Sequence, residues 1–215
     1  MSTPNSRIQA GQRILDFYTQ HAKDFGNSSQ GVGWKDDNAQ LIRFAQLTKV
    51  ILGKEKFSIN DLGCGAGHFY NYLISENYFP AAYKGYDILD EMIELAKGSL
   101  LPNSSVTLNR IQSASEMNIA DYTIASGIFN VKYEAEETEW LRHILTTLET
   151  MHNKSSLGFA FNLLTKYSDK ELMQAYLYYA DPLFLFDYCK KNFSKNVALL
   201  HDYFQYDFTV IVRKN

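Results

Sequence analysis

The sequence has 215 residues and a mass of 24.7 kDa, which suits one compact domain that folds without disulfide bonds or a structural metal. Its 21 lysine and arginine residues against 24 aspartate and glutamate residues give a net charge of −3, without the basic excess typical of nucleic-acid-binding proteins. Two cysteines are too few for a disulfide framework. Residues 1–12 are too polar for a signal peptide, and no apolar run reaches the ~20 residues that span a bilayer. We therefore expect a cytoplasmic protein.

The first 52 residues are predicted to form N-terminal helices and a lid. Helical spacing of apolar residues favours helices over residues 13–23 and 37–52. Between them lies a polar segment with three glycines and Trp34, the kind of segment that can close over a ligand. Trp34 could equally be a simple anchoring aromatic residue.

From residue 53 onward, short apolar runs alternate with helical stretches, which is typical of a parallel sheet covered by helices on both faces. The predicted helices cover residues 69–76, 90–97 and 136–152, and the link between the third and fourth strands is long enough only for a turn. The last two runs are separated by three residues, too few for a crossover helix, so the last strand must be antiparallel. The predicted strands are 57–62, 81–88, 106–111, 122–126, 157–164, 197–204 and 208–213. We therefore predict a single α/β domain over residues 1–215, with a Rossmann-like, mostly parallel, seven-stranded sheet in residues 53–215 and a C-terminal antiparallel hairpin.

The strongest local motif is the run DLGCGAGH, which begins at Asp61 where the first strand should end. Gly63, Gly65 and Gly67 would let the backbone approach a ligand closely and direct amide groups toward it. The dinucleotide-binding fingerprint requires G-x-G-x-x-G, and here His68 stands at the position of its third glycine. The spacing therefore disfavours a diphosphate ligand.

Asp87 lies twenty residues after Gly67, at the predicted end of the second strand. A carboxylate at this place can accept hydrogen bonds from the two hydroxyls of a ribose. A glycine turn followed by a ribose-binding acid indicates a nucleoside ligand.

This combination resembles the class I S-adenosylmethionine-dependent methyltransferase family, over residues 57–215, and in particular a bacterial subgroup of unassigned substrate. The resemblance implies methyl transfer from S-adenosylmethionine to a small-molecule acceptor, with S-adenosylhomocysteine as product. It also implies that Ile88 packs on the adenine. Many members of the family have an acidic residue after the third strand that contacts the adenine amino group. Here that acid is missing or displaced to Glu116, so either Ser115 or Glu116 would make this contact. The full set of implied cofactor contacts is Arg43, Asp61, Gly63, Gly65, Gly67, Asp87, Ile88, Ser115, Ser126 and Gly127. The implied substrate contacts are Trp34, Asn130 and Asn162.

If the acceptor is a hydroxyl or an amine, a base must take its proton, and His201 and Tyr167 are the candidates. His201 could instead be a surface histidine. The tyrosines at 176, 178 and 179 could form either a half-buried helix face or part of a cover over the substrate. Asp61 could be only a helix cap, and Arg43 only a surface residue. The histidines show no metal-ligand spacing, so no metal site is predicted.

Two other function classes remain open at this stage. A nicotinamide-dependent oxidoreductase would use a related sheet, although His68 and the closing hairpin disfavour it. A non-catalytic module could keep the nucleoside site without a substrate side. The sequence leaves open the acceptor atom, the need for a base, and the oligomeric state.

Overall fold

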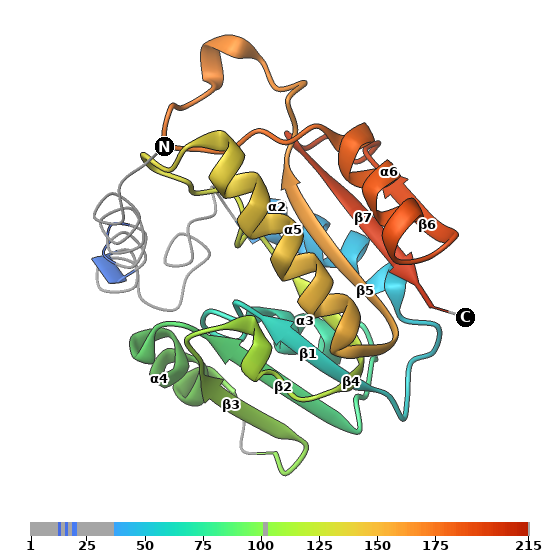
Figure 1. Ribbon diagram of the computed structural model, residues 1–215. Helices are drawn as coiled ribbons and strands as arrows, with labels where there is room; N and C mark the ends of the chain where they lie inside the picture. Colours follow the sequence, from blue (N-terminus) through green and yellow to red (C-terminus); the bar gives the residue numbers. More distant parts are fainter. Residues whose placement is uncertain (1–12, 14–15, 17–18, 21–36, 101–102, 215) are drawn as a thin grey trace.

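A seven-stranded sheet forms the centre of the part of the chain described by the computed structural model, which covers residues 13, 16, 19–20, 37–100 and 103–214 (Figure 1). The strand order is β3-β2-β1-β4-β5-β7-β6. β1 to β5 are parallel, and β7 pairs antiparallel with both β5 and β6. The strands are β1 (Ser58–Leu62), β2 (Ala82–Asp87), β3 (Val106–Arg110), β4 (Ala120–Ala125), β5 (Ser155–Leu164), β6 (Asn196–Leu200) and β7 (Asp207–Arg213). The predicted fold class, including the antiparallel last strand, is confirmed.

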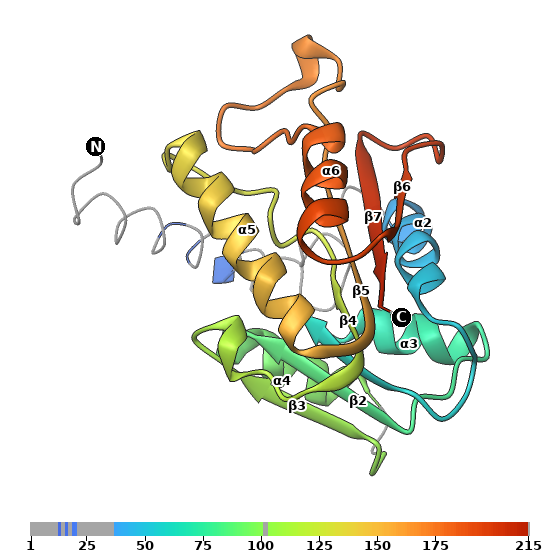
Figure 2. The same ribbon diagram turned by 45° about the vertical axis from the view of Figure 1, so that its right-hand side comes forward.

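Helices cover both faces of this sheet, so the parallel strands are shielded from water on either side (Figures 1 and 2). α5 and α6 pack on one face, while α2 and α3 pack on the other, and α4 lies along β2 and β3. The helices are α2 (Asp37–Leu47), α3 (His68–Ser75), α4 (Asp90–Ser99), α5 (Glu137–Asn153) and α6 (Pro182–Asn192). Short 3₁₀ helices are η2 (Thr48–Val50), η3 (Ala114–Glu116) and η4 (Lys170–Leu172).

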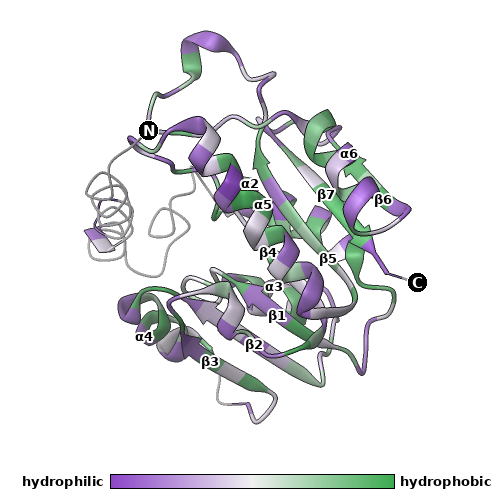
Figure 3. Ribbon diagram, viewed as in Figure 1, coloured by the Kyte–Doolittle hydropathy of each residue, from purple (hydrophilic) through white to green (hydrophobic). Residues whose placement is uncertain are grey.

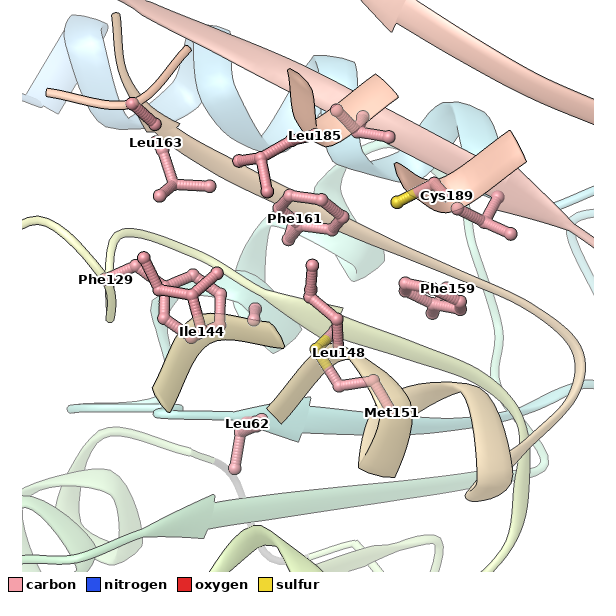
Figure 4. Packing of buried hydrophobic residues seen from close by; sticks show 14 of the residues in the cluster. Leu62, Phe129, Ile144, Leu148, Met151, Phe159, Phe161, Leu163, Leu185 and Cys189 are labelled. Carbon is pink, nitrogen blue, oxygen red and sulfur yellow. The ribbon is translucent and has the colours of Figure 1, made fainter. Parts of the chain in front are cut away.

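The larger hydrophobic core lies between the sheet and α5. Ile144, Leu148 and Met151 repeat at helical spacing and point toward the phenylalanines of β5 (Figure 4). Hydrophilic residues alternate with them along α5 and keep its other side in water (Figure 3). This packing fixes α5 over the middle of the sheet and so fixes every α5 side chain that reaches the site.

The structure differs from the sequence prediction mainly after β5. Between β5 and β6 the prediction offered a helix only as one alternative for the tyrosines at 176, 178 and 179, but the helix of this crossover is α6, which begins later. Asp181 accepts hydrogen bonds from the N–H groups of Leu183 and Phe184, and Pro182 is at the first helical position. The tyrosines at 176, 178 and 179 are not on a helix. Two isolated β-bridges hold this segment, one between Leu177 and Val131 and one between Ala180 and Thr165.

Strand β6 also ends earlier than predicted. It stops at Leu200, so His201 lies in the loop to β7 rather than on a strand. Phe204, at a positive φ of 56° in this loop, is fully exposed. The prediction continued the strand to Phe204 because this residue is apolar, four positions beyond the end of β6 in the structure.

The N-terminal prediction is covered only in part. Arg13, Asp16, Thr19 and Gln20 are helical, and α2 confirms the second helix, although its last turn is the 3₁₀ helix η2. Trp34 and most of the predicted lid lie outside the described residues.

Within the described residues, no helix combines the length and the apolar character needed to cross a membrane. The described His, Cys, Asp and Glu residues form no group of three that could hold a metal ion.

Candidate functional site

A cavity of about 690 Å³ opens at the carboxyl ends of β1, β2 and β4. The chain runs from β1 outward to β3 and then returns to β4 on the other side of β1, so this is the place where the strand order reverses. Open α/β sheets bind their ligands at such a point. Most of the residues that line the cavity come from α2, the loops after these strands, and α5.

The glycine turn between β1 and α3 forms one wall, and its conformation depends on glycine. Gly63, Gly65 and Gly67 have φ values of 75°, 51° and 83°. A Cβ on Gly63 would lie 2.2 Å from Cγ2 of Ile128, and one on Gly67 would lie 3.1 Å from the side chain of Leu100. Gly63 is therefore required by packing within the protein itself, which sequence reasoning had not anticipated, whereas at Gly67 the positive φ is the main constraint.

Asp87 lies directly against this turn. Its Oδ2 accepts a hydrogen bond from the Gly65 N–H at 3.0 Å, and its Oδ1 accepts one from the Leu89 N–H at 3.0 Å. The carboxylate is buried, and this burial raises its pKa, while the amide hydrogen bonds favour the charged form. Each oxygen keeps further lone pairs, so the carboxylate can accept hydrogen bonds from a ligand in the cavity.

Asp61, one of the cavity-lining residues, is a second buried carboxylate. It accepts a hydrogen bond from the Tyr83 hydroxyl. Burial raises the pKa of Asp61 to about 7, Tyr83 opposes the rise, and the nearby charge of Asp87 adds to it. Its side chain faces a buried acid and a tyrosine, so Asp61 is more than a helix cap.

This raised pKa predicts a pH-dependent stability. The folded protein holds a proton on Asp61 that the unfolded chain has released above pH 4, so the free energy of unfolding should fall as the pH rises from about 4 to 8. The Asp61 contribution amounts to up to about 4 kcal/mol over this range. Asp61→Asn should remove most of this slope in urea denaturation measured at pH 5 and pH 8. Equal slopes in the parent protein and the variant would contradict the raised pKa.

The residues predicted to read an adenine edge lie elsewhere. Glu116 accepts hydrogen bonds from the N–H groups of Gln112 and Ser113, both at 2.8 Å, in the capping box of η3. Ser115 is exposed, and the cavity wall here is made by Gln112, Ser113 and Ala114. Ile88 does line the cavity, with 46% of its surface exposed.

The loop after β4 forms the opposite wall. The Ser126 Oγ lies in this wall, buried and without a hydrogen-bond partner among the described residues. The Gly127 N–H donates to Asn162 Oδ1 at 2.7 Å, and Asn130 Oδ1 accepts from the Leu164 N–H at 3.1 Å. Asn130 lines the cavity, whereas Asn162 is fully buried behind it and supports Gly127.

Arg43 on α2 reaches the cavity from the far side. Its Nε donates to the carboxylate of Asp207, and its Nη1 donates to the Ala39 carbonyl at 2.8 Å. Both partners of this ion pair are buried. Arg43 is therefore not a surface residue, and Asp207 is a polar residue of β7 that sequence reasoning missed.

The two predicted bases are not brought to the cavity. His201 and Tyr167 are adjacent, with ring centroids 6.1 Å apart, but both are exposed and stand apart from the described lining residues. Two other histidines do line the cavity. His68 Nδ1 is 3.2 Å from Nε2 of Gln40. His143 on α5 is an exposed residue, but desolvation of its ring at the cavity wall lowers its pKa and favours the neutral imidazole. Tyr176 also lines the cavity, which places part of the tyrosine cluster at the site.

No family model matches the chain. A Mycobacterium tuberculosis H37Rv protein, provisionally named a methyltransferase, is 46% identical over 166 residues, which is 77% of this chain and 98% of that protein. The sequence similarity thus covers nearly all of that relative.

Solved structures with a similar fold share 12–13% of their residues with this chain. A DhpI–SAM–HEP complex has a TM-score of 0.68 and covers 100% of both chains. Magnesium protoporphyrin IX methyltransferase from Synechocystis PCC 6803 with bound SAM has a TM-score of 0.65 over 100% of this chain and 99% of its own. The N-methyltransferase NodS from Bradyrhizobium japonicum WM9 with S-adenosylhomocysteine has a TM-score of 0.61 over 92% and 97%. At this identity they show a shared fold.

Proposed function

The chain belongs to the class I S-adenosylmethionine-dependent methyltransferase family, and we propose that it transfers a methyl group from S-adenosylmethionine to a small-molecule acceptor. The observation that carries this proposal is the cavity at the strand-order reversal, where the glycine turn and Asp87 meet. The same reversal point binds ligands in other open α/β sheets.

The residues of the cavity fit this cofactor. Asp87 has spare lone pairs for ribose hydroxyls. Ser126 lines the cavity, and its buried Oγ has no hydrogen-bond partner among the described residues. Arg43 lines the cavity and provides a positive charge that can pair with the carboxylate of the cofactor's amino-acid part. When bound, S-adenosylmethionine supplies a methyl group on a positively charged sulfur, and the buried Asp87, whose charged form the Gly65 and Leu89 amides favour, provides compensating negative charge.

The protein has three tasks in such a reaction. The loop after β4, held by Asn162 and by the Asn130 hydrogen bond to Leu164, orients the acceptor. The buried part of the cavity wall, around Asp61 and Leu62, limits the access of water. A neutral histidine in the cavity wall can take a proton from a hydroxyl or an amine, and the lowered pKa of His143 favours this form.

The small-molecule acceptor is supported by the cavity and by the neighbours' names. A cavity of about 690 Å³ has the size of a small-ligand site, and must accommodate both cofactor and acceptor. Two of the structural neighbours are named for small-molecule chemistry, namely a magnesium porphyrin methyltransferase and a complex with HEP. The net charge of −3 supports an acceptor other than nucleic acid, and two buried free cysteines support action in the reducing cytoplasm.

Two measurements test the proposal. Thermal shifts with S-adenosylhomocysteine, NAD and NADP should show stabilisation by S-adenosylhomocysteine alone, and stabilisation by NAD or NADP instead would favour an oxidoreductase. Transfer of a labelled methyl group to members of a metabolite library should then identify the acceptor. Cofactor binding without transfer to any member would favour a non-catalytic binding module.

The positions of the histidines predict which one affects turnover. His201→Ala and Tyr167→Phe should leave the rate of methyl transfer unchanged, because both side chains stand apart from the cavity. His143→Gln should lower kcat by about 10²–10⁴-fold if the acceptor loses a proton during transfer. The pH profile of kcat distinguishes the roles, because a base that must be deprotonated makes the parent's kcat rise with pH, and the variant should lose this rise. A loss of activity in His201→Ala but not in His143→Gln would contradict this assignment.

A further inference from the structure

A buried polar network joins four distant segments of the chain behind the cavity. It runs from Arg43 on α2 through Asp207 on β7 and Asn162 on β5 to Gly127 in the loop after β4. Asp207 and Asn162 have 1% and 0% of their surface exposed. The network therefore lies inside the protein, although its two ends, Arg43 and Gly127, reach the cavity.

The carboxylate of Asp207 is the centre of this network. Its Oδ2 accepts hydrogen bonds from the Nε of Arg43 and, at 3.4 Å, from the Nδ2 of Asn162. Asn162 in turn accepts a hydrogen bond from the Gly127 N–H at 2.7 Å. The register of the sheet creates this meeting, because Asp207 pairs with Leu164 and Thr209 pairs with Asn162 across β5 and β7.

The guanidinium of Arg43 is held in one orientation by this arrangement. Its planar fork has the Nε directed at Asp207 and the Nη1 directed at the carbonyl of Ala39, one turn earlier in α2. Burying an ion pair is costly, and such pairs gain little stability over apolar replacements. A buried pair at the wall of a binding cavity is thus better explained by a need to fix the arginine than by a need for stability.

We propose that Asp207 is a positioning residue, which holds Arg43 ready for the carboxylate of the cofactor's amino-acid part. The proposal rests on the proposed function, since that carboxylate belongs to S-adenosylmethionine and its product. Asp207 acts through Arg43 and does not itself contact the cofactor. Through Asn162, the same residue links the site of the cofactor's carboxylate to Gly127, in the loop after β4.

Two ligands that differ at the carboxylate test this role. S-adenosylhomocysteine carries the amino-acid part, and 5′-methylthioadenosine lacks it while keeping the nucleoside and the sulfur. Asp207→Ala should weaken S-adenosylhomocysteine by about 10- to 100-fold in calorimetry, the size expected for loss of well-aligned charged hydrogen bonds, and leave 5′-methylthioadenosine unchanged. Asp207→Asn, whose amide oxygen can still accept from the Nε of Arg43, should recover most of the affinity.

Arg43→Ala supplies the matched variant. It should show the same selective loss, and the double variant Arg43→Ala/Asp207→Ala should bind S-adenosylhomocysteine no more weakly than Arg43→Ala alone. The double variant also leaves no unpaired buried charge, so it keeps the test possible if Asp207→Ala fails to fold.

The outcomes separate the two claims. Equal loss of both ligands in the variants, or an Asp207→Ala effect that adds fully to that of Arg43→Ala, would overturn the positioning role. A parent protein that binds neither ligand would instead contradict the proposed function.

Discussion

Asp87→Ala should bind S-adenosylhomocysteine about 10- to 100-fold more weakly than the parent protein. The carboxylate is buried at the cavity wall beside the Gly65 amide, so a hydrogen bond from a ribose hydroxyl to it is charge-assisted and shielded from water. Losing such bonds costs about 1.5–3 kcal/mol of binding free energy. Calorimetric titration of the variant against the parent measures the loss directly.

Asp90→Ala is the matched control for this variant. Asp90 is an exposed carboxylate three residues further along, at the start of α4 and outside the described cavity lining. It should bind like the parent. Because Asp87 also accepts the Gly65 and Leu89 amides, Asp87→Ala should lose some stability, so its folding is checked by circular dichroism before titration. Unchanged affinity in a folded Asp87→Ala variant would remove Asp87 from the cofactor site.

Gly63→Ala should destabilise the whole protein by about 2–5 kcal/mol. The added Cβ would lie 2.2 Å from Cγ2 of Ile128, and the φ of 75° is unfavourable for any residue with a side chain. The urea midpoint of unfolding should therefore fall strongly. The turn also carries the Gly63 hydrogen bond to the Tyr86 carbonyl, at 2.8 Å, which ties it to β2.

Two variants show whether packing causes this effect. Gly98→Ala adds a methyl group on α4 where no atom lies within 4 Å, and it should be neutral or stabilising by up to about 1 kcal/mol. Adding Ile128→Ala to Gly63→Ala removes the clashing methyl group and should recover part of the stability. If Gly63→Ala unfolds at the parent's urea concentration, the glycine is not required by packing.

Most of the sheet could be predicted because strand–helix alternation is a local signal. The seven apolar runs predicted the number of strands, and the helical stretches between them and the short C-terminal connection predicted their directions. α6 was missed although Asp181 and Pro182 form a recognisable helix start, because its apolar and polar residues follow no clear helical period. The end of β6 was misplaced because Phe204, an apolar residue, lies exposed in a turn.

The site was predictable where a local motif or the family resemblance carries it. The glycine turn and Asp87 lie within 25 residues of one another, and the structure brings them into contact. Asp207 and His143 enter the site through the register of β7 and the packing of α5, which no local pattern reveals. His201 and Tyr167 were chosen by residue type and by the expected strand ends. His201 lies in the loop after the shortened β6 and Tyr167 lies beyond the end of β5, and neither is among the described lining residues.

The central claim is that the cavity at the carboxyl ends of β1, β2 and β4 binds S-adenosylmethionine and its product. A crystal structure of the protein with S-adenosylhomocysteine tests it most directly. The account predicts that the ribose hydroxyls lie within hydrogen-bond distance of Asp87 and that the amino-acid carboxylate faces Arg43. Ligand density outside this cavity, or a ribose that makes no contact with Asp87, would contradict it.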